Sequence, residues 1–210
     1  MSRIIQNFDA LAINDLRRDA LAIAEAGYGA IDTEKVVKRK VQVNDGELMI
    51  GGKTYQLAGR RIYFIGVGKC AVVAGRAIEK VLGDAFISGV ALDVSDTNPN
   101  TGSKIEVHIG THPLPSETNV RATERIVEFL SGRREDDLVL FFISGGGSAL
   151  LCLPTAPMTC TEESELFKKL TNKGAPIQDL NTVRKHTSRA RGGALAVAAY
   201  PAEVISLIAS

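Results

Sequence analysis

The residues best suited to chemistry lie in a glycine-rich segment that reads FFISGGGSALL. It contains the candidate ligand-binding residues Ser144, Gly145, Gly146, Gly147 and Ser148. Glycine is costly to order, so three in a row directly after an apolar run need a reason. Backbone N–H groups at a turn between a strand and a helix can point together at an anion, and glycine lets a ligand approach closely. The pattern favours a ligand site, and a tight packing turn is the alternative.

A second glycine turn reads GVGKCA, residues Gly66–Ala71. As G-x-G-x-x-A it loosely fits a dinucleotide-binding turn, with Asp93 near the end of the next strand as the ribose-binding acid. As a phosphate-binding turn it uses Gly66 and Gly68 for close approach. Lys69 then supplies a cation where negative charge develops. A surface lysine beside a packing turn is the third interpretation.

One histidine follows another predicted strand, in the segment THPLPSE, residues Thr111–Glu117. Two prolines stiffen this loop, so the side chain of His112 has a restricted range of positions. We treat His112 as a candidate binding residue, with a structural hydrogen-bonding role as the alternative.

A donor-rich segment, LNTVRKHTSRARGG, begins at Leu180. On a helix, Asn181, Arg184 and Lys185 fall on one face by their spacing of three and four residues. This face is predicted to bind an anion in a cleft, and a solvated basic surface is the alternative.

The composition excludes several other functions. The formal net charge is +1 and aromatic residues make up 5%, which disfavours a nucleic-acid partner. There is no signal-like N-terminus and no run of 18 apolar residues, so we expect no membrane association. Three cysteines without a CxxC pattern indicate a reducing, cytoplasmic setting, and no residue cluster has metal-ligand spacing.

Apolar periodicity predicts the elements that position these residues. We expect a helix from Leu11 to Tyr28 that ends at its glycines, and a β-hairpin within Lys35–Leu57. Strands are predicted at Arg61–Gly66, Phe86–Val94, Lys104–Gly110, Asp137–Ser144 and Glu203–Ile208. Helices are predicted at Lys69–Leu82, Ser116–Leu130, Glu162–Leu170 and Ile177–Tyr200. The fold class is therefore α/β, a mostly parallel sheet with helices on both faces, plus an N-terminal helix and a β-hairpin, and ligands bind beyond the strands' carboxyl ends.

The four motifs, in this order, resemble the glycerate 2-kinase family. The resemblance implies that residues 1–210 form a Rossmann-like N-terminal domain and that the family's C-terminal domain is absent from this chain. It also implies phosphoryl transfer from ATP to D-glycerate, giving 2-phosphoglycerate, with Mg²⁺ as the metal. By resemblance Lys69 is the catalytic residue, and the binding motifs fall on Ser144–Ser148 and Val183–His186.

Two other functions remain open at this point. One is an NAD-dependent hydroxypyruvate reductase that uses GVGKCA and Asp93, and the other is a stand-alone nucleotide-binding domain. Because the resemblance stops near the middle of the family's length, residues 1–210 alone are expected to fold without phosphorylating glycerate. The surface left uncovered is expected to favour a homodimer through an apolar patch.

Overall fold

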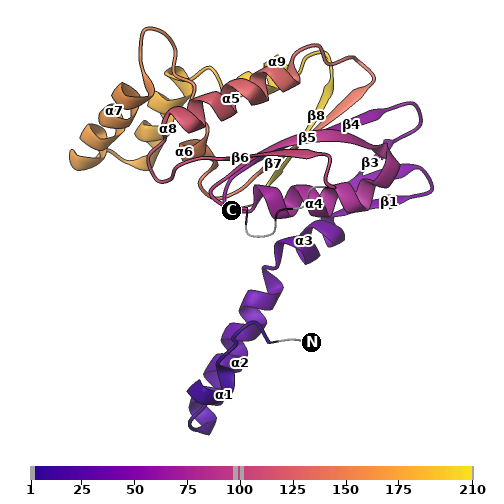
Figure 1. Cartoon of the computed structure of the whole chain (residues 1–210), viewed down its shortest axis with the longest axis vertical. Coiled ribbons are helices and arrows are strands. Elements are labelled where there is room, and N and C mark those ends of the chain that lie inside the picture. Colours follow the sequence, from indigo (N-terminus) through magenta and orange to yellow (C-terminus); the bar gives the residue numbers. More distant parts are fainter. Residues whose placement is uncertain (1–2, 97–98, 100–101, 210) are drawn as a thin grey trace.

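A five-stranded parallel sheet forms the centre of the molecule (Figure 1). The computed structural model describes residues 3–96, 99 and 102–209. The strand order is β6-β5-β4-β7-β8. The strands are β4 (Arg61–Val67), β5 (Phe86–Asp93), β6 (Ile105–Ile109), β7 (Asp137–Ile143) and β8 (Glu203–Ile208). The central strands β4 and β7 are apolar and almost wholly buried, as expected for parallel strands covered on both faces. The predicted sheet is confirmed.

Helices cover both faces of this sheet. On one face, α4 (Ala71–Leu82) packs against the sheet in a core that includes Phe64. On the other face, α5 (Glu117–Leu130) and α9 (Ala194–Ala198) pack against a second core that includes Ile65. Figure 1 shows these layers above and below the sheet. The predicted α/β architecture is therefore confirmed.

The segment before the sheet differs from prediction. The predicted hairpin region begins as a helix, α3 (Thr33–Lys40), because the Asp32 side chain accepts a hydrogen bond from the N–H of Lys35 at 2.8 Å and caps it. Three antiparallel strands follow, rather than a single hairpin. They are β1 (Val41–Asn44), β2 (Glu47–Ile50) and β3 (Lys53–Gln56). Asp45 and Gly46 have positive φ angles of 50° and 79°, and they form the predicted turn between β1 and β2.

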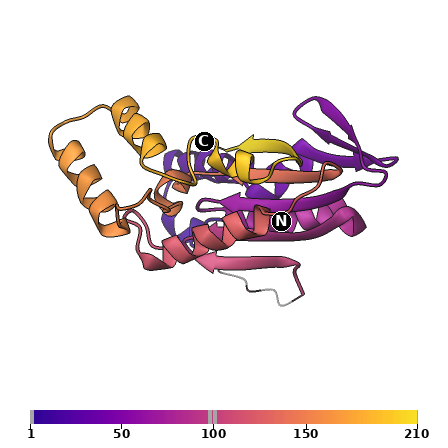
Figure 2. The ribbon, with the colours of Figure 1, turned by 90° about the horizontal axis from the view of Figure 1, so that it is seen from above.

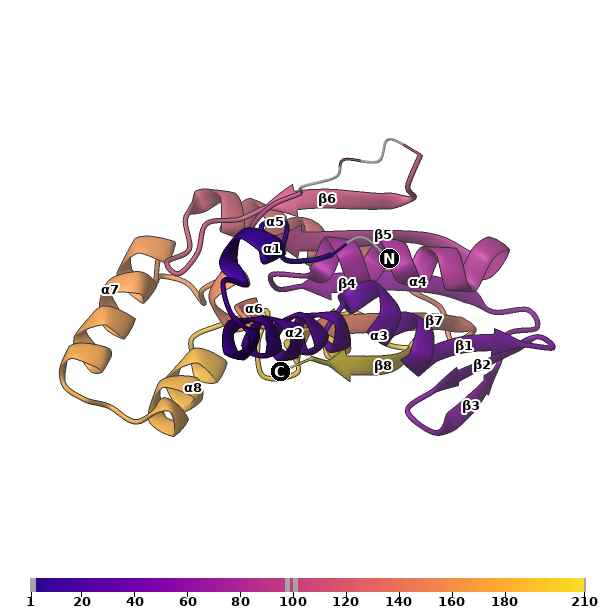
Figure 3. The same cartoon turned by 90° about the horizontal axis from the view of Figure 1, so that it is seen from below.

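An N-terminal arm precedes this small sheet and projects from the body in Figure 1, and in Figure 3, seen from below, it lies in front of the body. It consists of α1 (Phe8–Leu11) and α2 (Asp15–Ala30). The predicted N-terminal helix is thus present, but Gly27 and Gly29 lie inside it and do not end it. None of the α2 residues is buried. No helix in the described part of the chain is long and apolar enough to cross a membrane.

The region after β7 contains three further helices before α9. They are α6 (Gly147–Leu150), α7 (Cys160–Asn172) and α8 (Ile177–His186). The helix predicted over residues 177–200 is broken, because α8 ends at His186 and the backbone of residues 187–189 pairs with residues 153–155. Gly192 and Gly193, with positive φ angles of 65° and 96°, then precede α9. Figure 2 shows α7 and α8 lying beyond one end of the sheet.

Candidate functional site

Two glycine loops meet at the carboxyl edge of the sheet. Strand β4 leads into residues 68–70 and strand β7 leads into residues 144–146, and these two strands are hydrogen-bonded neighbours. The N–H of Ser144 donates to the carbonyl of Val67 at 2.9 Å, and the N–H of Lys69 donates to the carbonyl of Gly145 at 3.0 Å. The loops are therefore held in fixed register, at the edge where parallel α/β sheets bind ligands.

Gly68 permits this close contact. Its φ is 128°, and a Cβ at this position would stand 2.1 Å from Ser144 Oγ and 2.7 Å from the Ser144 carbonyl oxygen. Gly66 has a different reason to be glycine, since a Cβ there would stand 2.8 Å from the ring of buried Phe64. The structure thus places Gly66 in the core, where it packs against its neighbours, and not at a surface open to ligand.

Two predicted site residues, Lys69 and His112, from two separate loops lie close to Gly146 in the triple-glycine loop. Its φ is 89°, and a Cβ built there would lie 3.1 Å from His112 Cδ2 and 3.4 Å from Lys69 Cε. Lys69 and His112 are both exposed to solvent. An ammonium group and an imidazole therefore flank the middle glycine of the triple-glycine loop.

A buried amide holds the His112 loop in this position. Asn119 is fully buried, and its Oδ1 accepts a hydrogen bond from the N–H of Thr111 at 2.9 Å. Its Nδ2 donates to the carbonyls of Thr111 and Leu150, at 3.1 and 3.0 Å. Sequence reasoning missed Asn119, and the only available signal was its position three residues after the helix-capping Ser116.

The triple-glycine loop offers backbone donors to a ligand. Among the described residues, the N–H groups of Gly145, Gly146 and Ser148 donate to no group of the chain, whereas that of Gly147 donates to the Ser144 carbonyl at 3.1 Å. These residues line a pocket of about 350 Å³ together with Arg184. Free N–H groups and a cation that line the same pocket are suited to binding an anion.

Arg184 is the one member of the predicted basic face that lines this pocket. Its guanidinium carbon lies 4.7 Å from the ring centroid of Phe167, and within the described residues it forms no ion pair. Burial, and after it the positive charge of Arg191, lowers the pKa of Arg184. Asn181 lies on the same helix but outside the pocket lining. The stem of Lys185 lies against Gly192, where an added Cβ would stand 3.2 Å from Lys185 Cβ.

Asp93 has a structural role that disfavours the predicted ribose contact. The side chain is 2% exposed, Oδ2 accepts from the N–H of Val72 at 3.1 Å, and Oδ1 accepts from the N–H of Val94 at 2.7 Å. Val72 is in the first turn of α4, so the carboxylate caps that helix from a neighbouring strand. Both oxygens are used inside the protein and neither is presented to a dinucleotide.

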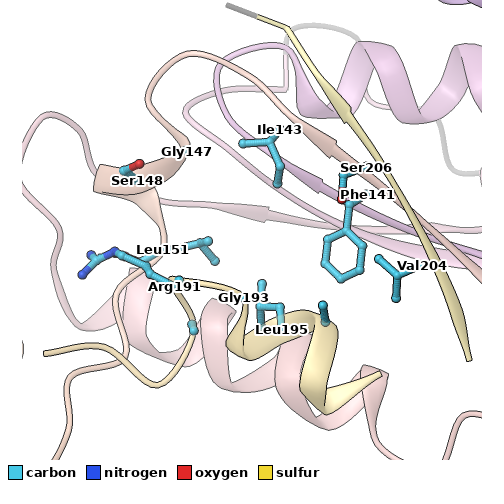
Figure 4. A pocket seen from close by; sticks show the side chains of 13 residues that line it. Phe141, Ile143, Gly147, Ser148, Leu151, Arg191, Gly193, Leu195, Val204 and Ser206 are labelled. Atoms are coloured by element: carbon cyan, nitrogen blue, oxygen red, sulfur yellow. The ribbon is translucent and has the colours of Figure 1, made fainter. Parts of the chain in front are cut away.

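A second, apolar pocket of about 250 Å³ lies between β7, β8 and α9 (Figure 4). Phe141 and Val204 form its apolar side, and Gly147 and Ser148 lie at its rim. The Arg191 side chain extends away from Phe141 and Val204 in this view. Arg191 instead pairs with Glu163.

This ion pair is buried and was not predicted. Arg191 Nη1 lies 2.6 Å from Glu163 Oε1, and the two side chains are 7% and 1% exposed. Arg191 Nη2 also donates to the carbonyl of Leu151, which ties the segment after α8 to the end of α6. The sequence showed Arg191 only as one donor in a basic segment.

The described residues contain no group of three or more His, Cys, Asp or Glu side chains that could hold a metal ion. Mg²⁺ in proteins is commonly bound by one or two carboxylates together with substrate phosphates. We therefore assign no metal ligand among the described residues and no step to the metal.

Comparison with known proteins identifies the family. Residues 19–210 match the family described as "Domain of unknown function (DUF4147)". The chain belongs to this family. Glycerate kinase from Bos taurus is 36% identical over 210 residues, which cover 93% of this chain and 40% of that protein. D-glycerate 2-kinase from Thermotoga maritima is 32% identical over 176 residues, covering 84% of this chain and 42% of that protein.

A solved structure has the same fold. A protein from Pyrococcus horikoshii OT3 superposes with a TM-score of 0.82 at 33% identity, covering 94% of this chain and 44% of that chain. The resemblance to glycerate kinases inferred from the motifs is thus confirmed. The chain spans less than half the length of the relatives that it matches.

Proposed function

We propose that this chain carries the loop side of the active site of an ATP-dependent D-glycerate 2-kinase. The convergence of Lys69 and His112 on Gly146, beside the three free backbone N–H groups, carries this proposal. The names of the Bos taurus and Thermotoga maritima relatives support the choice of glycerate as the acceptor.

The chemistry demands positioning and charge stabilisation. A hydroxyl oxygen of D-glycerate bonds to the γ-phosphorus of ATP, the bond from that phosphorus to the β,γ-bridging oxygen breaks, and the hydroxyl proton is released. Phosphoryl transfer is accelerated by cations and oriented N–H groups at the equatorial oxygens. Lys69 and the N–H groups of Gly145, Gly146 and Ser148 are the groups proposed for this task, with Arg184 as a further anion contact.

Several expectations accompany this proposal. We assign residues 1–210 to the Rossmann-like N-terminal domain of such a kinase, acting in the cytoplasm. Bound Mg²⁺ would neutralise charge on the phosphates of ATP. A homodimer stays a prediction, for which the exposed apolar side chains Leu16 and Ile23 on α2, at 80% and 75% exposure, offer one surface.

The reductase alternative is weaker. It requires Asp93 to bind a ribose hydroxyl, and both oxygens of Asp93 are occupied by backbone N–H groups. It also leaves unexplained why a lysine side chain lies over the triple-glycine loop.

Calorimetric titrations of the chain with ATP and with NADH test the proposed nucleotide. We expect ATP to bind, and inorganic tripolyphosphate to compete with it, because the loop donors contact the phosphate chain. Tight NADH binding without ATP binding would favour the reductase. ATP binding by the whole protein that contains residues 1–210, without ADP formation when D-glycerate is added, would favour a nucleotide-binding function without kinase activity.

A further inference from the structure

A small polar cavity lies beside the glycine-loop pocket, between the loop of residues 113–115 and helices α6, α7 and α8. Its volume is about 30 Å³, and its polar lining includes Ser148, Ser164, Arg184 and Arg191. About 10–15 Å³ suffices for one water molecule, so the cavity admits a group of only a few atoms. It shares Ser148, Ala149 and Arg184 with the larger pocket, so a single ligand can reach both.

Two buried polar atoms, in residues that line this cavity, have no hydrogen-bond partner among the described residues. They are Ser164 Oγ, in a residue that is 9% exposed, and Nε of Arg191, whose side chain is 7% exposed. The other two nitrogens of Arg191 are already bound to Glu163 and to the Leu151 carbonyl. Because buried polar groups in native proteins are nearly always hydrogen-bonded, these two atoms point to a missing ligand.

The charges around the cavity define that ligand further. Two guanidinium groups, Arg184 and Arg191, face one carboxylate, Glu163. Glu163 is already engaged, with Arg191 nitrogens at 2.6 and 3.2 Å and the thiol of Cys152 donating at 3.4 Å. One positive charge, on the half-buried Arg184, is therefore left without a counter-charge among the described residues, and an anion bound beside it would supply one.

We infer that this cavity is the subsite for the carboxylate of a small hydroxy acid. Arg184 and the Nε–H of Arg191 donate to the two carboxylate oxygens, and the hydroxyl of Ser164 donates to one of them. The carbon atoms that bear hydroxyl groups then extend past Ser148 into the glycine-loop pocket. Naming D-glycerate as this acid rests on the proposed function, whereas the match to a monocarboxylate rests on the cavity alone.

Calorimetric titration of the chain with D-glycerate tests the subsite, with glycerol as the analogue that lacks a carboxylate. We expect D-glycerate to bind and glycerol not to bind. Ser164→Ala removes an unpaired hydroxyl and should leave the melting temperature unchanged, while it weakens D-glycerate binding about tenfold or more, as expected for a lost hydrogen bond to a charged group. Arg184→Gln should weaken it further. The matched controls are Thr161→Ala, an exposed hydroxyl on α7, and Arg189→Gln, an exposed arginine near Arg191.

The outcomes test the carboxylate subsite and the kinase proposal separately. The subsite is overturned if D-glycerate does not bind, if glycerol binds equally well, or if Ser164→Ala and Arg184→Gln bind D-glycerate like the wild type. ATP titrations of the same samples separate the proposals. A chain that binds ATP without D-glycerate contradicts the subsite alone, and a chain that binds D-glycerate through Ser164 and Arg184 without ATP contradicts the kinase proposal alone.

Discussion

Gly68 sets how closely the two glycine loops approach each other. Replacing it with alanine combines an unfavourable φ of 128° with a Cβ placed 2.1 Å from Ser144 Oγ and 2.7 Å from the Ser144 backbone oxygen. Because the backbone cannot yield as a side chain can, we expect Gly68→Ala to lower the free energy of unfolding by roughly 2–5 kcal/mol. Urea denaturation followed by circular dichroism measures this change.

Gly59→Ala is the matched control for that prediction. Gly59 also has a positive φ, 75°, but an added Cβ would meet no atom within 4 Å. Gly59→Ala should therefore lower the free energy of unfolding by only about 1 kcal/mol, through backbone strain. Equal losses in the two variants would show that the contact with Ser144 is not what requires glycine at position 68.

At the level of residues, the sequence predicted where the candidate groups lie better than why each is present. Lys69 and His112 lie close together, as expected, because both follow strand ends and strand ends share one edge of the sheet. The burial of Gly66 beside Phe64 was not foreseen, because a glycine required by a packed ring and a glycine required by a ligand look alike in a sequence. The helical spacing of Asn181 and Arg184 indicated a shared face, but not which residue of that face reaches the pocket.

Helix α4 is anchored at its start by a neighbouring strand. Its N-cap residue, Cys70, forms no side-chain cap, and the buried Asp93 carboxylate at the end of β5 accepts the N–H of Val72 instead. Asp93→Ala leaves the buried N–H of Val72 and the partly buried N–H of Val94 unpaired, and we expect it to reduce the free energy of unfolding by about 2–4 kcal/mol. Thermal unfolding and ATP titration of the same variant measure the effect.

This variant also tests the role of Asp93 in binding. Since the carboxylate faces the helix backbone, folded Asp93→Ala at low temperature should retain wild-type ATP affinity. A variant with unchanged stability and lost nucleotide binding would instead support a ribose contact and the reductase interpretation.

Elements that depend on one local capping group were the hardest to predict. Residues 36–43 alternate in polarity like a strand, yet α3 extends to Lys40 because Asp32 caps its start and Val37 alone is buried. The predicted long helix at 177–200 ends at His186, because residues 187–189 pair with the backbone of residues 153–155. A local cap in one place and a long-range backbone contact in the other outweigh a periodic pattern.

For the whole molecule, the parallel sheet could be predicted because its strands are continuous apolar runs bounded by glycine and polar residues. The orientation of the N-terminal arm could not be predicted from the sequence. Helical periodicity shows which face of a helix is apolar, but it does not show which part of the protein covers that face. On α2 the apolar side chains of Leu16 and Ile23 face solvent in this chain. The chain also spans only 40% of the length of the Bos taurus relative.

The most direct test of the kinase proposal is D-glycerate-dependent ADP formation by the whole protein that contains residues 1–210, compared with its Lys69→Ala variant. We expect the wild type to form ADP and 2-phosphoglycerate. We expect Lys69→Ala to keep its melting temperature, because the side chain is exposed, and to lose about 10²-fold or more in kcat, equivalent to about 2.7 kcal/mol of transition-state stabilisation. Lys53→Ala, an exposed lysine on β3, is the control and should behave like the wild type. An unchanged kcat in Lys69→Ala would contradict the central claim that the two glycine loops and Lys69 hold the transferring phosphoryl group.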